Sequence, residues 1–340
     1  HIIIYLSHFV RLITGFFIFL NLKITKLVNN IVIETDRLIL RKFKDGDGLH
    51  FFQMNADSEV IKYTGDTPFI DLDAAHQFID AYDAYATTGM GRWAVLRKSD
   101  NEFLGWCGLK YHPEERVVDI GFRFYRCYWG YGYATESSKA VIQYAFNTLK
   151  YPFLVAHAHI DNIASHAVIK KCGLQFLKDF DYGDLPAKLY RIDNSDYKLK
   201  QITSEETWPV RHPVLRKGRP LKDVYMEADE KPSTFHVGIY HHKTIIGVAS
   251  FMEDAKGRFT GKQYRLRGMA VLPEYRKKGI AELLLKRGED ILKTKGCTLL
   301  WFNARIVAVS FYKNTGYTTV GPEFDIPLIG PHFLMKKELK

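Results

Sequence analysis

The stretch "YRKKGIAELLL", residues 275–285, places basic residues at the start of a segment with helical apolar spacing. Helix starts favour acidic and hydroxyl side chains, and the N-terminus of a helix already carries partial positive charge. Lys277 and Lys278 are therefore unfavourable there unless an anion lies between them and the free backbone N–H groups. We interpret the stretch as a phosphate-binding turn, in which Gly279 lets phosphate oxygens approach the backbone closely.

A second glycine-bearing turn, "YWGYGYATESS", lies at residues 128–138 and carries aromatic residues instead of lysines. The feature that the two stretches share is the bare backbone before a helix, so the lysines are a local addition. Two other interpretations stay open: the aromatic residues of 128–133 pack in a core, and 276–281 is a solvated basic turn.

The elements around these stretches occur twice in the same order, which predicts two copies of one fold. The first copy, residues 31–195, reads as strand, two helical segments, a strand hairpin with a third strand, a helix, a strand, a short helix and two closing strands. Residues 196–340 repeat this order. Gly105 matches Gly247, Asn162 matches Asn303, and "KKCGL" matches "KNTGY". Mixed strands and helices in each copy indicate an α/β (α+β) layered fold.

The C-terminal copy resembles acyltransferases of the GNAT superfamily. Arg276, Gly279 and Ala281 form the family's Arg/Gln-x-x-Gly-x-Gly/Ala element, preceded by a strand and followed by "FYKNTGY". The N-terminal copy has Gly130 and Gly132, with Cys127 where the Arg or Gln would stand. Its segments "ETDRLILRKF", "DIGF" and "NIASHAVIKKCGL" are similar to the branch that includes ribosomal-protein N-terminal alanine acetyltransferases. The resemblance implies two tandem domains, each a central, mostly antiparallel sheet that is splayed at its fourth and fifth strands and flanked by helices.

The resemblance also implies acetyl-CoA as co-substrate, with its pyrophosphate on the backbone N–H groups of the two turns and its thioester carbonyl on N–H groups of the fourth strand. The residues implied in cofactor binding are Met269, Val271, Arg276, Lys277, Lys278, Gly279, Ile280, Ala281 and Asn303 in one copy, and Phe122, Phe124, Trp129, Gly130, Tyr131, Gly132, Tyr133, Ala134 and Asn162 in the other.

Acetyl transfer to an amine requires a neutral nucleophile and a proton donor for the departing thiolate. A lysine-type amine has a pKa about three units above neutral and an α-amino group about one, so a base matters more for the former. The resemblance assigns the donor role to Tyr312 and Ser165, and the base role to Asp119. No carboxylate lies in "QYRLRGMAV", so the base of the C-terminal copy stays unassigned.

The acceptor side of the C-terminal copy is expected to use Arg211, His212, Glu323 and His332, with a solvated basic loop as the alternative. We expect an acetyl-CoA-dependent N-acetyltransferase that works by direct attack of a primary amine, from a small molecule or a protein N-terminus, in a ternary complex. The alternative is that one copy is a non-catalytic acyl-CoA-binding or scaffolding module. Cys127 points to the N-terminal copy for that role, and the missing strand carboxylate points to the C-terminal copy.

The net charge of +10 suits ligands that carry several phosphates, while the chain has no basic arm or zinc-type spacing that would indicate nucleic acid. Four separated cysteines indicate a reducing cytoplasm. His157 and His159 share a strand face and could bind a metal, but no third ligand is evident, so no metal is expected.

The first thirty residues are strongly hydrophobic and differ in kind from the rest. Three interpretations stay open: a segment upstream of the true start, a docked hydrophobic helix or strand, and a membrane anchor over residues 1–22. The rest of the chain shows no transmembrane stretch.

Overall fold

The computed structural model describes residues 30–254, 258–327 and 329–339. The interpretations of residues 1–22 therefore fall outside the described residues. The chain divides into two compact units: the N-terminal unit ends at Ile192, and the C-terminal unit begins at Asp193 and includes Lys150–Pro152. Over the described part of the chain, no helix has both the length and the apolar content that a membrane span requires.

The N-terminal unit is a sheet in the order β1-β2-β3-β4-β5-β6-β8-β7. Its strands are β1 (Ile31–Glu34), β2 (Leu38–Arg41), β3 (Arg92–Arg97), β4 (Phe103–His112), β5 (Val117–Phe124), β6 (Phe153–His159), β7 (Gln175–Tyr182) and β8 (Leu185–Asp193). The helices are α2 (Asp47–Ala56), α3 (Ser58–Ile61), α4 (Leu72–Asp80), α5 (Ala84–Thr87), α6 (Tyr133–Asn147) and α7 (Ile163–Lys171).

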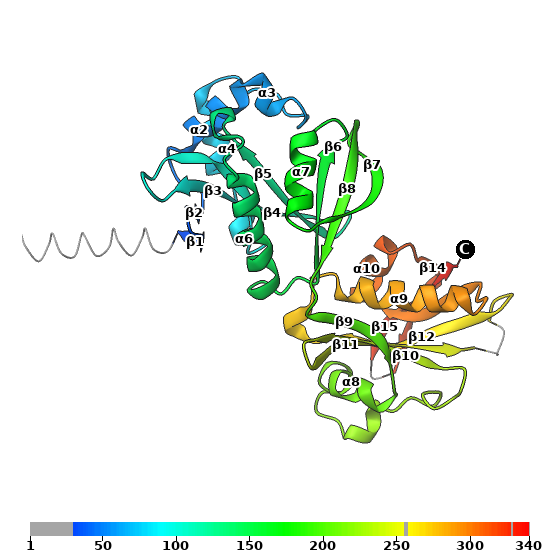
Figure 1. Ribbon diagram of the computed structural model, residues 1–340. Coiled ribbons are helices and arrows are strands. Elements are labelled where there is room, and N and C mark those ends of the chain that lie inside the picture. The colour runs from blue at the N-terminus through cyan, green and yellow to red at the C-terminus, as the bar shows by residue number, and fades with distance from the viewer. Residues whose placement is uncertain (1–29, 255–257, 328, 340) are drawn as a thin grey trace, which may run out of the picture. The chain divides into compact units, whose positions relative to one another are not determined.

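Strands β5 and β6, which correspond to the fourth and fifth strands of the expected fold, run parallel. They pair at Asp119 and Val155, after which β5 continues to Phe124 and β6 to His159. Figure 1 shows β6, β7 and β8, together with α7, set apart from the strands β1–β5. The two parallel strands therefore separate toward their C-terminal ends.

The C-terminal unit is a sheet in the order β14-β15-β13-β12-β11-β10-β9. Its strands are β9 (Tyr197–Ile202), β10 (Phe235–His241), β11 (Thr244–Glu253), β12 (Gln263–Val271), β13 (Leu299–Arg305), β14 (Thr318–Ile326) and β15 (Gly330–Glu338). The helices are α8 (Trp208–Leu215), α9 (Ile280–Thr294) and α10 (Val309–Asn314).

The same separation of parallel strands recurs here. β12 pairs with β13 up to Arg265 and Trp301, and then continues to Val271 without matching partners in that register. Between Val248 and Ser250 of β11, the facing strand β12 holds one extra residue, a β-bulge at which Gly268 has φ +59°. Both sheets are mixed, splayed and flanked by helices, so the predicted fold class is confirmed.

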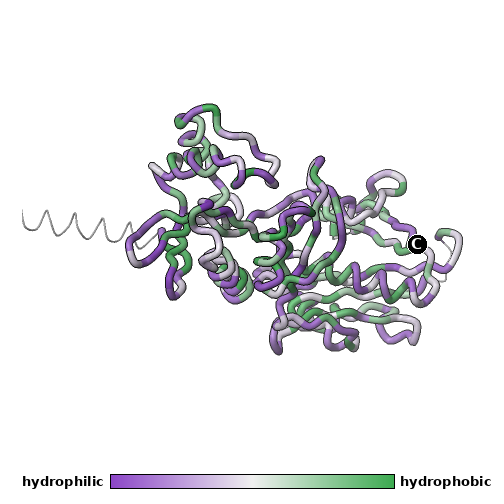
Figure 2. Tube along the Cα trace, turned by 45° about the horizontal axis from the view of Figure 1, so that its top comes forward, coloured by the Kyte–Doolittle hydropathy of each residue, from purple (hydrophilic) through white to green (hydrophobic). Residues whose placement is uncertain are grey.

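Apolar residues fill the layer between the sheet and α9 in the C-terminal unit. Figure 2 shows hydrophobic residues along the strands of each unit, while many of the connecting turns are hydrophilic. Gly288 of α9 lies directly over the buried ring of Phe251 on β11, so close that a Cβ at this position would overlap the ring. The helix can approach the sheet this closely only because residue 288 has no side chain.

We expect Gly288→Ala to destabilise the protein although alanine is the better helix former. The propensity gain is at most about 1 kcal/mol, whereas overpacking costs about 1–3 kcal/mol or more. The measurement is the midpoint of chemical unfolding, with Arg287→Ala, an exposed change on the same helix, as the control. A higher midpoint for Gly288→Ala than for wild type would contradict the packing described here.

Candidate active sites

Each unit starts its longest helix from a glycine in the left-handed conformation. Gly132 (φ 82°) precedes α6 and Gly279 (φ 80°) precedes α9. Two residues earlier, Gly130 (φ 84°) and Lys277 (φ 59°) also have positive φ, so the two turns have the same backbone shape. Successive N–H groups in such a turn, together with the free N–H groups of the first helical turn, form a concave anion-binding site.

The residue before each of these turns is anchored in the same way. Trp129 Nε1 donates a hydrogen bond to the carbonyl oxygen of Phe124 (3.0 Å), and Arg276 Nε donates one to that of Val271 (3.2 Å). In both units the acceptor is the last residue of the strand, five positions earlier. Trp129 therefore stands in the place of Arg276, and the expectation that Cys127 fills that place is wrong, because it counted from Gly130 instead of Gly132.

Positive charge reaches the two turns from different parts of the chain. In the C-terminal unit Lys277 is exposed and Lys278 Nζ donates to the carbonyl oxygen of Glu274. In the N-terminal unit the charge comes from Arg37, which donates to the carbonyl oxygen of Tyr131 (3.2 Å) and forms an ion pair with Glu136. Sequence reasoning missed Arg37, since its position between β1 and β2 gives no local sign of a contact with residue 131.

Asp119 lies at the point where β5 and β6 begin to separate, and it is almost fully buried. Both its oxygens accept hydrogen bonds from the Arg92 guanidinium, at 2.8 and 3.0 Å. His112 Nε2 lies 3.4 Å from Oδ1, and His157 Nδ1 lies 3.7 Å from Oδ2. Burial alone would raise the pKa of Asp119, but Arg92 and the two histidines together lower it to about 2.

The corresponding positions of the C-terminal unit carry different chemistry. Asp119 pairs with Val155 as Arg265 pairs with Trp301, so Arg265 takes the place of Asp119, and Asn303 that of His157. The Arg265 guanidinium lies over the Trp301 ring, 4.8 Å from its centroid. Sequence reasoning missed Arg265, because the extra residue of the bulge in β12 obscures the correspondence between the two strands. It missed Arg92 because this residue lies on β3, 27 positions from Asp119.

Asn162 and Asn303 are not equivalent, which corrects the repeat pairing drawn from the sequence. Asn162 is the N-cap of α7, where its Oδ1 accepts a hydrogen bond from the N–H of Ser165 (3.0 Å). Asn303 lies within β13, and its Oδ1 is buried with no partner among the described residues. A buried, unsatisfied acceptor beside the strand separation suits a ligand that carries an N–H donor.

The two predicted proton donors lie on the short helices after the separated strands. Ser165 is a half-buried residue in the first turn of α7. Tyr312 of α10 is buried against Phe302 and Tyr317, and burial raises the pKa of its phenol.

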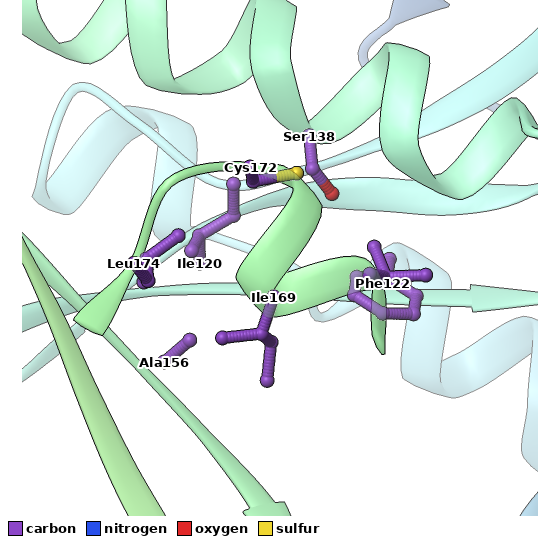
Figure 3. A pocket seen from close by; sticks show the side chains of 8 residues that line it. Ile120, Phe122, Ser138, Ala156, Ile169, Cys172 and Leu174 are labelled. Atoms are coloured by element: carbon purple, nitrogen blue, oxygen red, sulfur yellow. The ribbon is translucent and has the colours of Figure 1, made fainter. Parts of the chain in front are cut away.

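A small apolar cavity lies between the strands and helices of the N-terminal unit (Figure 3). Ile120 and Phe122 of β5 and Ala156 of β6 line one side. Residues of α6, α7 and the turn after α7 complete it: Ser138, Val168, Ile169, Cys172 and Leu174. The cavity lies on the helical face of the strand separation, whereas Asp119, two residues from Gly121 along β5, projects from the other face.

The four residues expected at an acceptor site lie in different environments of the C-terminal unit. Arg211 of α8 is fully buried and binds Asp229 and Ser250. His212 bonds the carbonyl oxygen of Arg219. Glu323 is exposed on β14, and His332 is buried on β15. Helix α8 contacts β11 and β12, and β13 separates these two strands from β15 and β14 in the sheet. The geometry therefore favours a packing role for Arg211.

The histidines of β6 face different acids: His157 faces Asp119, and His159 lies 3.8 Å from Asp161 and stacks on Tyr63. Among the residues that the structure describes, a group with ligand atoms within 4.8 Å of one another is formed by Asp196, His241 and His242. His241 Nδ1 is already hydrogen-bonded to the Tyr275 hydroxyl (2.9 Å).

Comparisons with known proteins identify the chain as an acyltransferase with two domains of one class. Residues 37–175 match the acetyltransferase (GNAT) domain model, and residues 190–317 match the acetyltransferase (GNAT) family model. The uncharacterized N-acetyltransferase YitI of Bacillus subtilis is 35% identical over 144 residues, which cover 42% of this chain and 97% of YitI. The chain belongs to the GNAT acetyltransferases.

Two further similarities are weaker. The FsC-acetyl coenzyme A-N(2)-transacetylase of Aspergillus fumigatus is 27% identical over 179 residues, covering 49% of this chain and 74% of that protein. A GNAT-family acetyltransferase structure from Bacillus anthracis has 24% identity and a TM-score of 0.42, covering 47% of this chain and 97% of its own.

We expect Gly279→Val to weaken acetyl-CoA binding to the C-terminal unit more than Lys277→Ala does. A side chain at φ 80° costs about 1–2 kcal/mol and also blocks the approach of phosphate to the backbone. Isothermal calorimetry measures the effect. Gly296→Val is the matched control, since Gly296 has φ +67° with open space around it and follows the far end of α9. Equal losses for Gly279→Val and Gly296→Val would show that backbone strain alone explains the effect.

Proposed function

We propose that this GNAT protein is an acetyl-CoA-dependent N-acetyltransferase that transfers the acetyl group directly to a primary amine in a ternary complex. The observation that supports the proposal most is the repeated turn: a positive-φ pair of residues, an anchored side chain at 129 or 276, and a long helix beside two separating strands. This arrangement offers backbone N–H groups to the pyrophosphate of acetyl-CoA. The gap between the strands is open to the pantetheine arm, which carries the thioester.

The proposed binding contacts follow from these features. Backbone N–H groups of 130–134 and of 277–281 hold the pyrophosphate, because those of Tyr128 and Trp129 already donate to the carbonyl oxygens of Tyr125 and Arg126. Arg37 supplies a guanidinium beside the turn in one unit, and Lys277 and Lys278 supply charge in the other. The Asn303 Oδ1 accepts a hydrogen bond from an amide N–H of the arm. In the N-terminal unit, the apolar side chains of Ile120 and Phe122 line the helical face of the gap.

In the proposed transfer, the amine nitrogen attacks the thioester carbon, a C–N bond forms and the C–S bond breaks. N–H groups near Phe122–Phe124 and Met269–Val271 stabilise the developing oxyanion. Ser165 and Tyr312 give a proton to the departing thiolate of coenzyme A. The phenol of Tyr312 is protonated at neutral pH, and burial, which raises its pKa, keeps it in that form.

The acceptor is a small-molecule amine or a protein N-terminus. The Aspergillus relative is named as an N(2)-transacetylase that uses acetyl coenzyme A, and this name supports an amine acceptor. Of the residues expected on the acceptor side, exposed Glu323 and half-buried His212 are the ones that a ligand can reach without rearrangement, whereas Arg211 and His332 are buried.

A second candidate function applies to the C-terminal unit alone. It has a complete phosphate turn, but Arg265 and Asn303 stand where the N-terminal unit has Asp119 and His157. An arginine at that place disfavours a positively charged amine. The C-terminal unit is therefore the candidate for an acyl-CoA-binding module without turnover.

The test combines calorimetry with an amine screen on the whole chain. We expect two acetyl-CoA binding events, of which Gly132→Val removes one and Gly279→Val the other. Coenzyme A release is then followed with peptides, polyamines, amino acids and aminoglycosides. Turnover that survives Gly279→Val and falls in Ser165→Ala assigns the reaction to the N-terminal unit.

The same screen with Gly132→Val reports on the C-terminal unit. Turnover that falls in Tyr312→Phe would show a second active site there, and binding without turnover would support the module. Absence of acetyl-CoA binding in the unmodified chain would overturn the proposed function.

A further inference from the structure

Asp119 is poorly suited to accept a proton itself, although its position in the N-terminal unit is that of the expected base. Both oxygens are engaged by Arg92, and the carboxylate is buried, with a pKa of about 2. A base whose pKa is about five units below neutral is a weak proton acceptor at pH 7. Asp119 is better suited to hold and polarise a neighbouring group.

His157 is the neighbour that faces the strand separation. It lies on β6 two residues beyond Val155, the residue paired with Asp119, and therefore on the side where β5 and β6 have parted. At the matching position of β5 stands Gly121, whose missing side chain leaves room for the Arg92 guanidinium. The His157 side chain is 22% exposed, so one part of the ring is accessible while the rest is packed.

The orientation of the His157 ring is fixed on two sides. Its Nδ1 points toward Asp119 Oδ2 at 3.7 Å, and its face stacks on the Tyr182 ring at 4.0 Å between centroids. Because the two ring nitrogens point in different directions, a proton on Nδ1 leaves the lone pair of Nε2 directed away from the carboxylate.

His112, the other histidine at Asp119, is less well placed. It pairs with Val117 at the start of β5, before the Asp119–Val155 pair and therefore away from the strand separation. Its Nε2 is buried and directed at Asp119 Oδ1, 3.4 Å away.

We propose that His157 is the proton acceptor for the amine in the N-terminal unit and that Asp119 is its positioning residue. This inference rests on the proposed N-acetyltransferase function. Nε2 of the neutral imidazole takes one proton from the attacking amine as the C–N bond forms, and the resulting imidazolium is stabilised by the Asp119 carboxylate. The proton later passes to solvent.

The charges around His157 favour the neutral form at pH 7. Burial lowers its pKa most, and Arg92 of β3, His112 and Lys110 of β4 lower it further, against the raising effect of Asp119 of β5. Tyr182 of β7 contributes an uncharged ring, since burial raises the pKa of its phenol. A base must be unprotonated, so turnover should decline only as the pH falls below the ordinary histidine value of about 6.5.

The test is the pH profile of kcat/KM for the whole chain carrying Gly279→Val, which limits turnover to the N-terminal unit. His157→Gln should lower kcat/KM by roughly 10²–10⁴-fold at pH 7.5 and abolish the acidic decline, with the Kd for acetyl-CoA unchanged. Asp119→Asn should shift the decline to lower pH, because loss of the anion destabilises the imidazolium. Calorimetric acetyl-CoA binding shows that each variant is folded.

Two comparisons separate the proposal from its alternatives. His159→Gln, on the same strand face, should keep the acidic decline, and free imidazole should restore part of the turnover of His157→Ala. If the acidic decline persists in His157→Gln, or is lost in His112→Gln instead, the role of His157 is overturned while the proposed N-acetyltransferase function stands. Absence of turnover with every amine in the parent chain overturns the proposed function, and with it this role.

Discussion

Both domains depend on one constraint: two parallel strands that pair at their start must separate before they end. In a continuous sheet the backbone groups of β5 and β6, or of β12 and β13, would satisfy one another. Here β5 pairs with β6 at Asp119, and β12 pairs with β13 up to Arg265. The separation leaves backbone donors, an apolar cavity and, in one domain, an Asp–His pair around the same gap. Helix α6, which follows β5, and helix α9, which follows β12, begin beside this gap.

The two domains share the anchoring of the phosphate turn and differ at the gap. Trp129 and Arg276 make the same hydrogen bond with unrelated side chains, so the bond to the end of the strand is the constant feature and the charge is not. The C-terminal domain has the bulge at Gly268, which the regular pairing of β4 with β5 lacks. The N-terminal domain has the buried carboxylate of Asp119 with His157 beside it. The two copies therefore share the turn and differ in the side chains at the strand separation.

Much of this was predictable because the signals were local. Glycines before an apolar helix identified both turns, and strand and helix order identified the repeat. Long-range contacts were not predictable: Arg37 reaches Tyr131, and Arg92 reaches Asp119, through pairings that span many residues. Burial was equally invisible for Arg211, because Asp229, which neutralises it in the interior, lies 18 residues further along the chain. Cys127 was misjudged because spacing alone does not show which glycine begins the helix.

The strand register, rather than the motif, determines which residues of the two copies correspond. Sequence landmarks placed Asn162 opposite Asn303, yet one caps a helix and the other lies in a strand. Counting from the parallel pair places Asn303 opposite His157 instead. This correspondence changes the chemistry expected of each domain, because a buried amide oxygen can bind an N–H donor but cannot take its proton at neutral pH. The absence of a carboxylate from "QYRLRGMAV" agrees with this register, because Arg265 occupies the place where the N-terminal domain holds Asp119.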